Sequence, residues 1–372
     1  MRAATAARAA PRAAALPSKA APHRAPAFPP RAARRAPLRV TAFREDEGPR
    51  PDTSRPSPLK RPAGLGGVPL SAPTALRPSR HAAAALALAA GAVGFCIWPH
   101  QVMSSMFEAG TAVGGAMQSQ TARLLGVAMG AAAATNIAES RAGGRAGGPA
   151  EPKLEADTHS RLDRSLGAFG LASVIAAALS FTPLAARMMP GHAAGAALLS
   201  PPAMGVIGAL GALQWWVSGM ASPITITKSL LREVLSTLSG TPNMNAGAYG
   251  LMGAAFLASG LAYMAAPAAT LAGVFGGAAA GVPAAAGLLW MVVGAALSGV
   301  TAGACYALKE GAAYKDLSES KFKWLNFGLA ATALAHVLIL VPYAAGQGGP
   351  MAQPLMALWA AALLLGGVNA FA

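Results

Sequence analysis

Charge is scarce in most of this chain. Charged residues make up 12% of its 372 residues and hydrophobic residues make up 54%, whereas about 25% of the residues in a typical soluble domain are charged. A large water-soluble domain needs more charge than this to cover its surface. The composition therefore favours a polypeptide that is solvated mainly by lipid.

A basic face for nucleic-acid binding is also lacking, although the formal net charge is +15. Sixteen of the 29 Lys and Arg lie in residues 1–80, which contain four acidic residues. The rest of the chain is nearly neutral. Once the N-terminal segment is set aside, no basic surface remains that would attract phosphate groups.

The signs of a soluble enzyme are absent as well. The sequence has no Walker loop, convincing dinucleotide fingerprint, His-Glu-x-x-His or Cys-x-x-Cys motif, and no pair of buried carboxylates is expected for acid–base catalysis. The two cysteines, Cys96 and Cys305, cannot form a disulfide framework. They are expected toward opposite membrane faces, as small apolar packing residues. We therefore expect no catalytic activity.

The N-terminus has the composition of an organelle transit peptide. Residues 1–44 contain ten Arg or Lys, many Ala and Pro and no acidic residue, without the apolar core of a secretory signal. Val40-Thr41-Ala42 resembles a plastid processing site. A plastid transit peptide over residues 1–44 is predicted, with a mitochondrial one as the alternative. Residues 45–80 are proline-rich and predict a disordered linker.

Hydrophobic segments fill the remainder. A bilayer is spanned by about 20 apolar residues in a helix, and eight segments approach this length. We predict an all-α integral membrane protein with about eight transmembrane helices. The segments are Ala82–Trp98, Thr121–Ala138, Leu166–Ala186, Ala203–Val217, Ala248–Ala266, Ala285–Leu308, Leu325–Ala345 and Pro354–Ala372.

The positions of the basic residues agree with eight crossings. Loops 139–165, 218–247 and 308–324 fall on one side and contain eleven Lys or Arg, while the opposite loops contain only Arg123 and Arg187. Basic loops stay on the side from which a protein is inserted. Both termini are therefore expected on the stromal side of a thylakoid or inner envelope membrane, or on the matrix side in the mitochondrial alternative.

The hydrophobic region contains an internal duplication. An aromatic residue, a proline four residues later and a phenylalanine eight residues after that occur twice, as Phe95, Pro99 and Phe107 and as Tyr263, Pro267 and Phe275. A Leu-Leu pair and a glycine follow in both copies. We predict two four-helix repeats, 81–219 and 247–372. An even number of crossings in each repeat gives both the same orientation.

Glycine pairs predict where helices pack closely. Gly126 and Gly130 form a GxxxG motif in the second segment, and Gly299 and Gly303 form another in the sixth. Small residues at this spacing let helix backbones approach each other in lipid. Because the two segments correspond, the motifs are expected to meet near the axis that relates the repeats.

Two loops on the basic side differ in character. Loop 139–165 is glycine-rich and evenly charged, which predicts a solvated linker. Residues 220–246 join the repeats and contain leucines and a valine at helical spacing. They predict an amphipathic helix that either lies on the membrane surface or packs against neighbouring loops.

Few polar residues fall inside the segments. His336 lies in the middle of the seventh and is a candidate ligand for chlorophyll magnesium, a substrate or a proton, with packing as the alternative. Gln214 precedes two tryptophans and is a candidate polar contact between helices. With so few reactive side chains inside, we predict a protein that supports the assembly of membrane complexes, such as pigment–protein complexes. The alternatives are a parallel-repeat permease for a small neutral solute and, third, a membrane enzyme.

Overall fold

The structure is a computed structural model that describes residues 77–106, 116–142, 156–180, 182, 201–279 and 284–371. These residues belong to one compact unit, Val68–Ala372. The predicted transit peptide, 1–44, and the linker up to residue 76 lie outside the described residues, as do Phe107 and Arg187.

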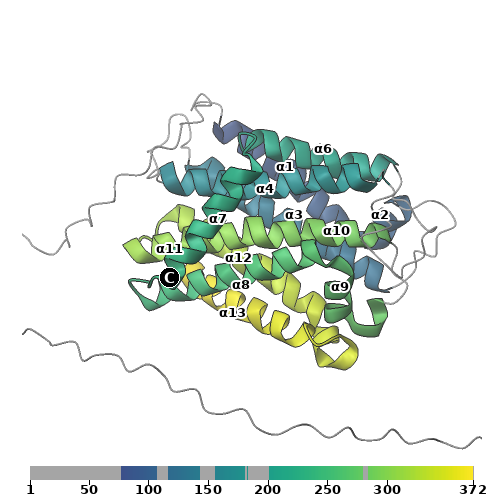
Figure 1. Cartoon of the computed structure of the whole chain (residues 1–372). Helices are drawn as coiled ribbons and strands as arrows, with labels where there is room; N and C mark the ends of the chain where they lie inside the picture. Colours follow the sequence, from purple (N-terminus) through teal and green to yellow (C-terminus); the bar gives the residue numbers. More distant parts are fainter. Residues whose placement is uncertain are drawn as a thin grey trace, which may run out of the picture. The chain divides into compact units, whose positions relative to one another are not determined.

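Apart from turns and short loops, the described residues are helical, and they contain no strand. Figure 1 shows the long helices lying side by side, with α7 crossing one end of the bundle and α2 and α9 at the other. The elements are α1 (Arg77–Ile97), α2 (Pro99–Met106), α3 (Ala116–Ala142), α4 (Ala156–Ser180), α6 (Pro201–Val217), α7 (Pro223–Leu238), α8 (Met244–Ala265), α9 (Pro267–Phe275), η1 (Gly276–Ala279), α10 (Ala284–Ala295), η2 (Ala296–Thr301), α11 (Ala302–Tyr314), α12 (Ser320–Pro342), η3 (Tyr343–Gln347) and α13 (Ala352–Phe371).

Six helical stretches are long and apolar enough to cross a membrane. The predicted all-helical class with membrane-compatible helices is therefore confirmed. The six are Arg80–Ile97, Thr158–Ser180, Met244–Ala265, Ala286–Tyr314, Ser320–Gly346 and Ala352–Phe371. They do not include α3, which is more polar, or α6, whose apolar part is the shorter Gly205–Val217.

Two long helical elements lie at the centre of the bundle. The first is α3, and the second is the continuous helix formed by α10, η2 and α11, which is almost entirely buried. Around them, α1 packs on α3, α4 on α6, α8 on α10 and α11, and α12 on α13. In addition, α12 contacts α3 while α4 contacts α10 and η2. Because α3 touches protein on most sides, it tolerates polar residues that lipid would exclude.

Proline starts both short helices at the far end of the bundle. Pro99 is the first residue of α2 and Pro267 the first residue of α9, and each follows the end of a long helix. Proline suits a first helical turn, where its missing N–H would have no partner in the helix. The repeated prolines therefore each begin a short helix.

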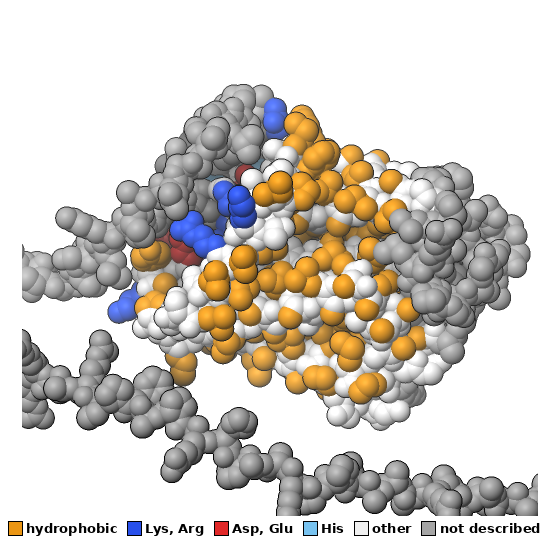
Figure 2. All heavy atoms as spheres, in the orientation of Figure 1, with side chains coloured by type: hydrophobic (Ala, Val, Ile, Leu, Met, Phe, Trp, Pro, Cys, Tyr) orange, Lys and Arg blue, Asp and Glu red, His pale blue; other side chains and the backbone are white. Residues whose placement is uncertain are grey.

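The outer wall of the bundle is apolar, and most charged side chains of the described residues lie at one end. Leu86, Leu251, Leu338 and Leu364 are all at least 65% exposed. Figure 2 shows hydrophobic side chains spread along the helices and Lys, Arg, Asp and Glu side chains at the end where α7 lies. A wall of this kind matches the hydrocarbon region of a bilayer, and the charged end matches an aqueous interface.

The two GxxxG motifs contact different helices. A Cβ atom on Gly126 would lie within 3.0 Å of Phe95 and Ala92 in α1. A Cβ atom on Gly299 or Gly303 would meet Ser165 in α4 at 2.9 and 2.0 Å. The expectation that the motifs meet each other is corrected: each pair holds its own helix against an outer neighbour.

The prediction of a solvated linker over 139–165 also needs correction. Helix α3 continues to Ala142 and α4 begins at Ala156, so part of this stretch is helical. Residues 143–155 lie outside the described residues. The helices extend past their apolar parts because polar side chains there find partners in the bundle, as described next.

Candidate functional site

A buried polar cluster joins the first four long helices near the end of the bundle where α7 lies. His81 of α1, Asn136 of α3, Asp163 of α4 and Gln214 of α6 each contribute one side chain. His81 Nε2 lies 3.3 Å from Asp163 Oδ1, and His81 Nδ1 lies 2.7 Å from Asn136 Oδ1. Asn136 Nδ2 donates to Gln214 Oε1 at 2.7 Å. Two hydrogen bonds and the close approach of His81 to Asp163 therefore connect all four helices.

The orientation of the Asn136 amide defines the tautomer of His81. Asn136 Nδ2 lies 2.9 Å from the carbonyl oxygen of Ala132, and a carbonyl only accepts, so the atom facing it is the amide nitrogen. The other amide atom, Oδ1, is therefore an acceptor. His81 Nδ1 must carry the proton that it donates there, and in a neutral ring the lone pair of Nε2 then points toward Asp163.

Glu139 of α3 lies beside this network and is only 3% exposed. Its Oε2 pairs with Nδ1 of His159 in α4, while its Oε1 has no hydrogen-bond partner among the described residues. The ligand atoms of His81, Glu139 and Asp163 all lie within 4.8 Å of one another. The sequence predicted no pair of buried carboxylates; α3 and α4 bring the buried Glu139 beside Asp163, which is only partly buried.

Burial has the largest effect on the pKa of the Glu139 carboxyl. It raises the pKa of this group, and the hydrogen bond and charge of His159 oppose that effect. A buried carboxylate is costly unless a cation or several donors stabilise it. Positive charge from protonated histidines or from a bound cation would therefore stabilise the cluster.

A second polar cluster lies among the last four long helices. Tyr249 of α8 donates to Asn326 Oδ1 of α12 at 2.5 Å, and Asn369 of α13 donates to the Tyr249 hydroxyl at 3.1 Å. Counted from the aromatic residues that precede the two prolines, Tyr249 corresponds to His81. Unlike the first cluster, the set of Tyr249, Asn326 and Asn369 contains no carboxylate or imidazole.

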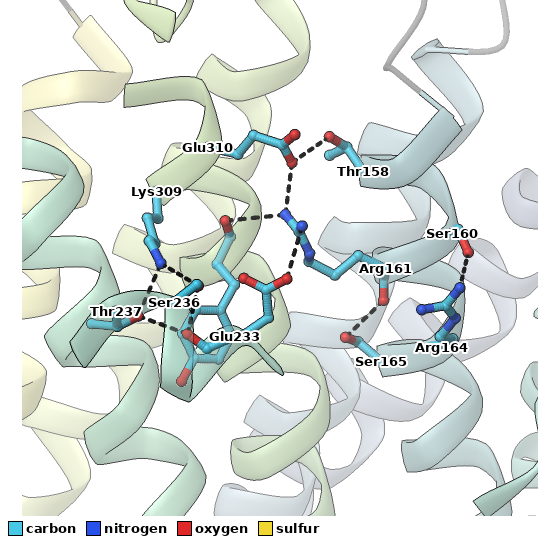
Figure 3. Close-up of polar contacts among 11 residues, drawn as sticks. Thr158, Ser160, Arg161, Arg164, Ser165, Glu233, Ser236, Thr237, Lys309 and Glu310 are labelled. Atoms are coloured by element: carbon cyan, nitrogen blue, oxygen red, sulfur yellow. Dashed lines mark hydrogen bonds and ion pairs between the residues drawn. The ribbon is translucent and has the colours of Figure 1, made fainter. Parts of the chain in front are cut away.

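An ion-pair network holds α7 against the bundle (Figure 3). The guanidinium of Arg161 in α4 lies 2.7 Å from Glu310 Oε2 of α11 and 2.9 Å from Glu233 Oε1 of α7. Lys309 of α11 donates to Ser236 Oγ at 2.8 Å and to Thr237 Oγ1 at 3.0 Å. One arginine therefore bridges three helices that are far apart in the sequence.

The amphipathic helix predicted within 220–246 is α7. Its buried residues are Ile226 and Thr237, and it contacts α4 and α8. Packing against neighbouring elements is therefore observed. An apolar stripe remains exposed on the other side, formed by Ile224, Leu231, Leu235 and Leu238. This stripe is suited to the membrane interface, so that position remains a prediction.

The two polar candidates from the sequence, His336 and Gln214, have different surroundings in the structure. The ring of His336 stacks on Trp359 of α13 at 3.8 Å, and its Nδ1 bonds to the Thr332 carbonyl at 2.9 Å. Trp359 also contacts Phe256 of α8. Gln214 belongs to the buried cluster and donates to Ser218 Oγ at 2.9 Å. His336 therefore lies in an aromatic contact of three helices, and Gln214 in a polar one.

A histidine that packs can be distinguished from one that binds pigment. His336→Phe keeps a ring against Trp359, so we expect stability within about 1 kcal/mol of the parent protein and unchanged pigment content after purification. His336→Ala removes the ring and is expected to cost about 2–4 kcal/mol. Thermal unfolding and absorption spectra measure both. Pigment that is present in the parent protein and lost in His336→Phe would contradict the packing role.

Sequence reasoning missed His81, Glu139 and Asp163 because each lies at the border of a hydrophobic segment. Charged residues at such borders usually reach water, so they attract no attention. A signal was available in α3, where Asn136 and Glu139 are three residues apart and share one helix face. No known protein family and no curated protein matches this chain in a sequence comparison.

Proposed function

We propose that the chain crosses a plastid membrane eight times, as two tandem repeats, and organises other membrane components without catalysing a reaction. The leader composition supports the plastid assignment, with a mitochondrial inner membrane as the alternative. The eight crossings would comprise the six membrane-compatible stretches together with α3 and α6. Both are long helices of the same bundle.

The pattern of helix contacts supports the duplication. In each proposed repeat the first long helix packs on the second and the third packs on the fourth. The third helix of each repeat also packs on the second helix of the other: α12 on α3, and α4 on α10 and η2. The proline-initiated helices α2 and α9 follow the first helix of each repeat. Two like-oriented repeats account for all of these pairings.

A single observation carries the functional proposal: the contact between the two repeats is closely filled. A void of about 20 Å³ lies between α3, α11, α12 and η2, enough for about one water molecule. Its lining is mostly apolar and includes the hydroxyl groups of Thr135, Thr301 and Thr332. A permease needs a polar-lined cavity at this place, whereas a helical support needs a rigid interior and an apolar wall.

Co-purification tests the proposal. The full chain, tagged at its C-terminus and extracted from plastid membranes in mild detergent, is expected to migrate in a native gel with other membrane proteins. Thr135→Val and Thr301→Val remove two hydroxyls of the void at nearly constant volume, and both are expected to leave the co-purifying proteins unchanged. Isolation of the chain alone, together with uptake of a neutral solute into proteoliposomes that these variants reduce, would favour the permease.

A further inference from the structure

We propose that His81, Glu139 and Asp163 form a binding site for one divalent transition-metal cation such as Zn²⁺, Mn²⁺ or Fe²⁺. The site would join α1, α3 and α4 at the end of the bundle where α7 lies. Imidazole and carboxylate groups together suit these ions, whereas Mg²⁺ and Ca²⁺ favour oxygen ligands alone.

The ligand atoms have spacings that suit such an ion. The distance from His81 Nε2 to Asp163 Oδ1 is 3.3 Å. Two ligands at about 2.0–2.1 Å from a tetrahedral ion lie about 3.3 Å apart. A ligand atom of Glu139 lies within 4.8 Å of both. Small rotations of the carboxylates therefore complete a three-ligand site with an open fourth position.

His81 is already oriented as a metal-binding histidine. Its Nδ1–H donates to Asn136 Oδ1 at 2.7 Å, and Asn136 is held by the carbonyl of Ala132 and by Gln214. A histidine that binds a metal commonly donates its other ring N–H to such an acceptor. This hydrogen bond fixes the tautomer and directs the unprotonated nitrogen, here Nε2, at the metal. The residues that support His81 are therefore Asn136 of α3 and Gln214 of α6.

Glu139 provides an independent observation. Its side chain is 2% exposed, and its Oε1 has no hydrogen-bond partner among the described residues. A buried carboxylate oxygen without a partner is costly, so it usually indicates a missing water or ion. His159 holds the other oxygen of Glu139, which fixes the carboxylate in the way that supporting hydrogen bonds fix metal ligands.

The site has a route to water and is unique in the described part of the chain. The side chains of Asp163 and His159 are 13% and 17% exposed, and both lie near the charged end of the bundle. An ion can therefore enter without crossing the apolar interior. The corresponding cluster of Tyr249, Asn326 and Asn369 has no carboxylate or imidazole, so we expect one ion per chain.

The test uses the full chain in detergent, with an affinity tag that lacks histidine. After treatment with EDTA and dialysis against Zn²⁺, the protein is expected to retain one Zn²⁺ per chain by mass spectrometry. Co²⁺ is expected to give a visible absorption band typical of nitrogen and oxygen ligands. Zn²⁺ at about 100 times its dissociation constant is expected to raise the thermal unfolding midpoint by about 5 °C or more.

Variants of matched size locate the ion. Glu139→Gln and Asp163→Asn each remove one ligand charge and are expected to weaken Zn²⁺ binding by at least about 100-fold. Asn136→Leu removes no metal ligand, but it removes the acceptor for His81 and the donor to Gln214, and it is expected to weaken binding by about 10- to 100-fold. Asp316→Asn, a carboxylate between two spans at the same end, is expected to bind Zn²⁺ like the parent protein.

Two results would overturn the proposal. One is a parent protein that retains no Zn²⁺ and gives no visible Co²⁺ band, which is decisive even when a variant fails to fold. The other is equal Zn²⁺ retention by the parent protein and by Glu139→Gln with Asp163→Asn combined. In either case the cluster consists of protonated histidines paired with carboxylates and binds no metal.

Discussion

Gly211→Leu is expected to destabilise the protein by at least about 3 kcal/mol, because α6 approaches α4 there with backbone against backbone. A Cβ atom on Gly211 would lie 2.6 Å from Ser173 Cβ and 2.8 Å from the Gly170 carbonyl oxygen. Neither atom can rotate away, so the two helices would have to separate. Reversible unfolding in mixed detergent measures the change, and loss of folded protein during extraction would be its extreme form.

Gly205→Leu is the matched control on the same helix. A Cβ atom there has nothing within 4 Å, so the leucine would extend from the outer wall. Leucine also favours a helix over glycine by about 0.8–1 kcal/mol. We expect this variant to be as stable as the parent protein or slightly more stable. Equal effects of the two substitutions would show that the contact between α4 and α6 is not close-packed.

The same type of contact occurs between α8 and α10. A Cβ atom on Gly260 would lie 2.3 Å from the Gly294 carbonyl oxygen, and one on Gly294 would lie 2.7 Å from the Gly260 carbonyl oxygen. Gly170, Gly211, Gly260 and Gly294 therefore bring the backbones of paired helices closer together than the two GxxxG motifs do. In lipid, such approaches replace the hydrophobic effect as the source of association.

Features of the fold that depend on neighbouring residues in one segment could be predicted from the sequence, whereas contacts between helices could not. Helix α8 could be anticipated because its apolar residues are continuous. Its start at Met244 follows Asn243, whose side chain accepts from the Ala246 N–H at 2.8 Å. Capping is a relation between residues three apart, which a sequence displays. Glycine contacts such as Gly211 with Gly170 depend on which faces meet across helices, which the GxxxG spacing did not reveal.

The candidate site shows the same limit more clearly. His336 attracted attention because it interrupts an apolar run, yet its environment is set by Trp359 from a different helix. Glu139 and Asp163 looked like solvated residues at segment ends. Their burial results from α3 being an inner helix and α4 packing across it. The buried cluster of His81, Glu139 and Asp163 therefore lies where the ends of three helices converge, and no single segment contains the pattern.

Arg161→Ala is expected to destabilise the protein by about 2–3 kcal/mol and to loosen α7, because it leaves Glu233 and Glu310 facing each other without their shared cation (Figure 3). The three side chains are 12–19% exposed, so the effect should be smaller than for a fully buried pair and should decrease with salt. Protease cleavage beside α7, near the exposed Met220, is expected to become faster.

The control is Arg164→Ala, whose guanidinium bonds to Ser160 within the same helix, and it should change stability by less than about 0.5 kcal/mol. Arg161→Lys should recover only part of the loss, since one ammonium cannot hold two carboxylates in the fixed fork of a guanidinium. If Arg161→Ala and Arg164→Ala behave alike, α7 is held by its apolar contacts with α4 and α8, and the ion pairs add nothing.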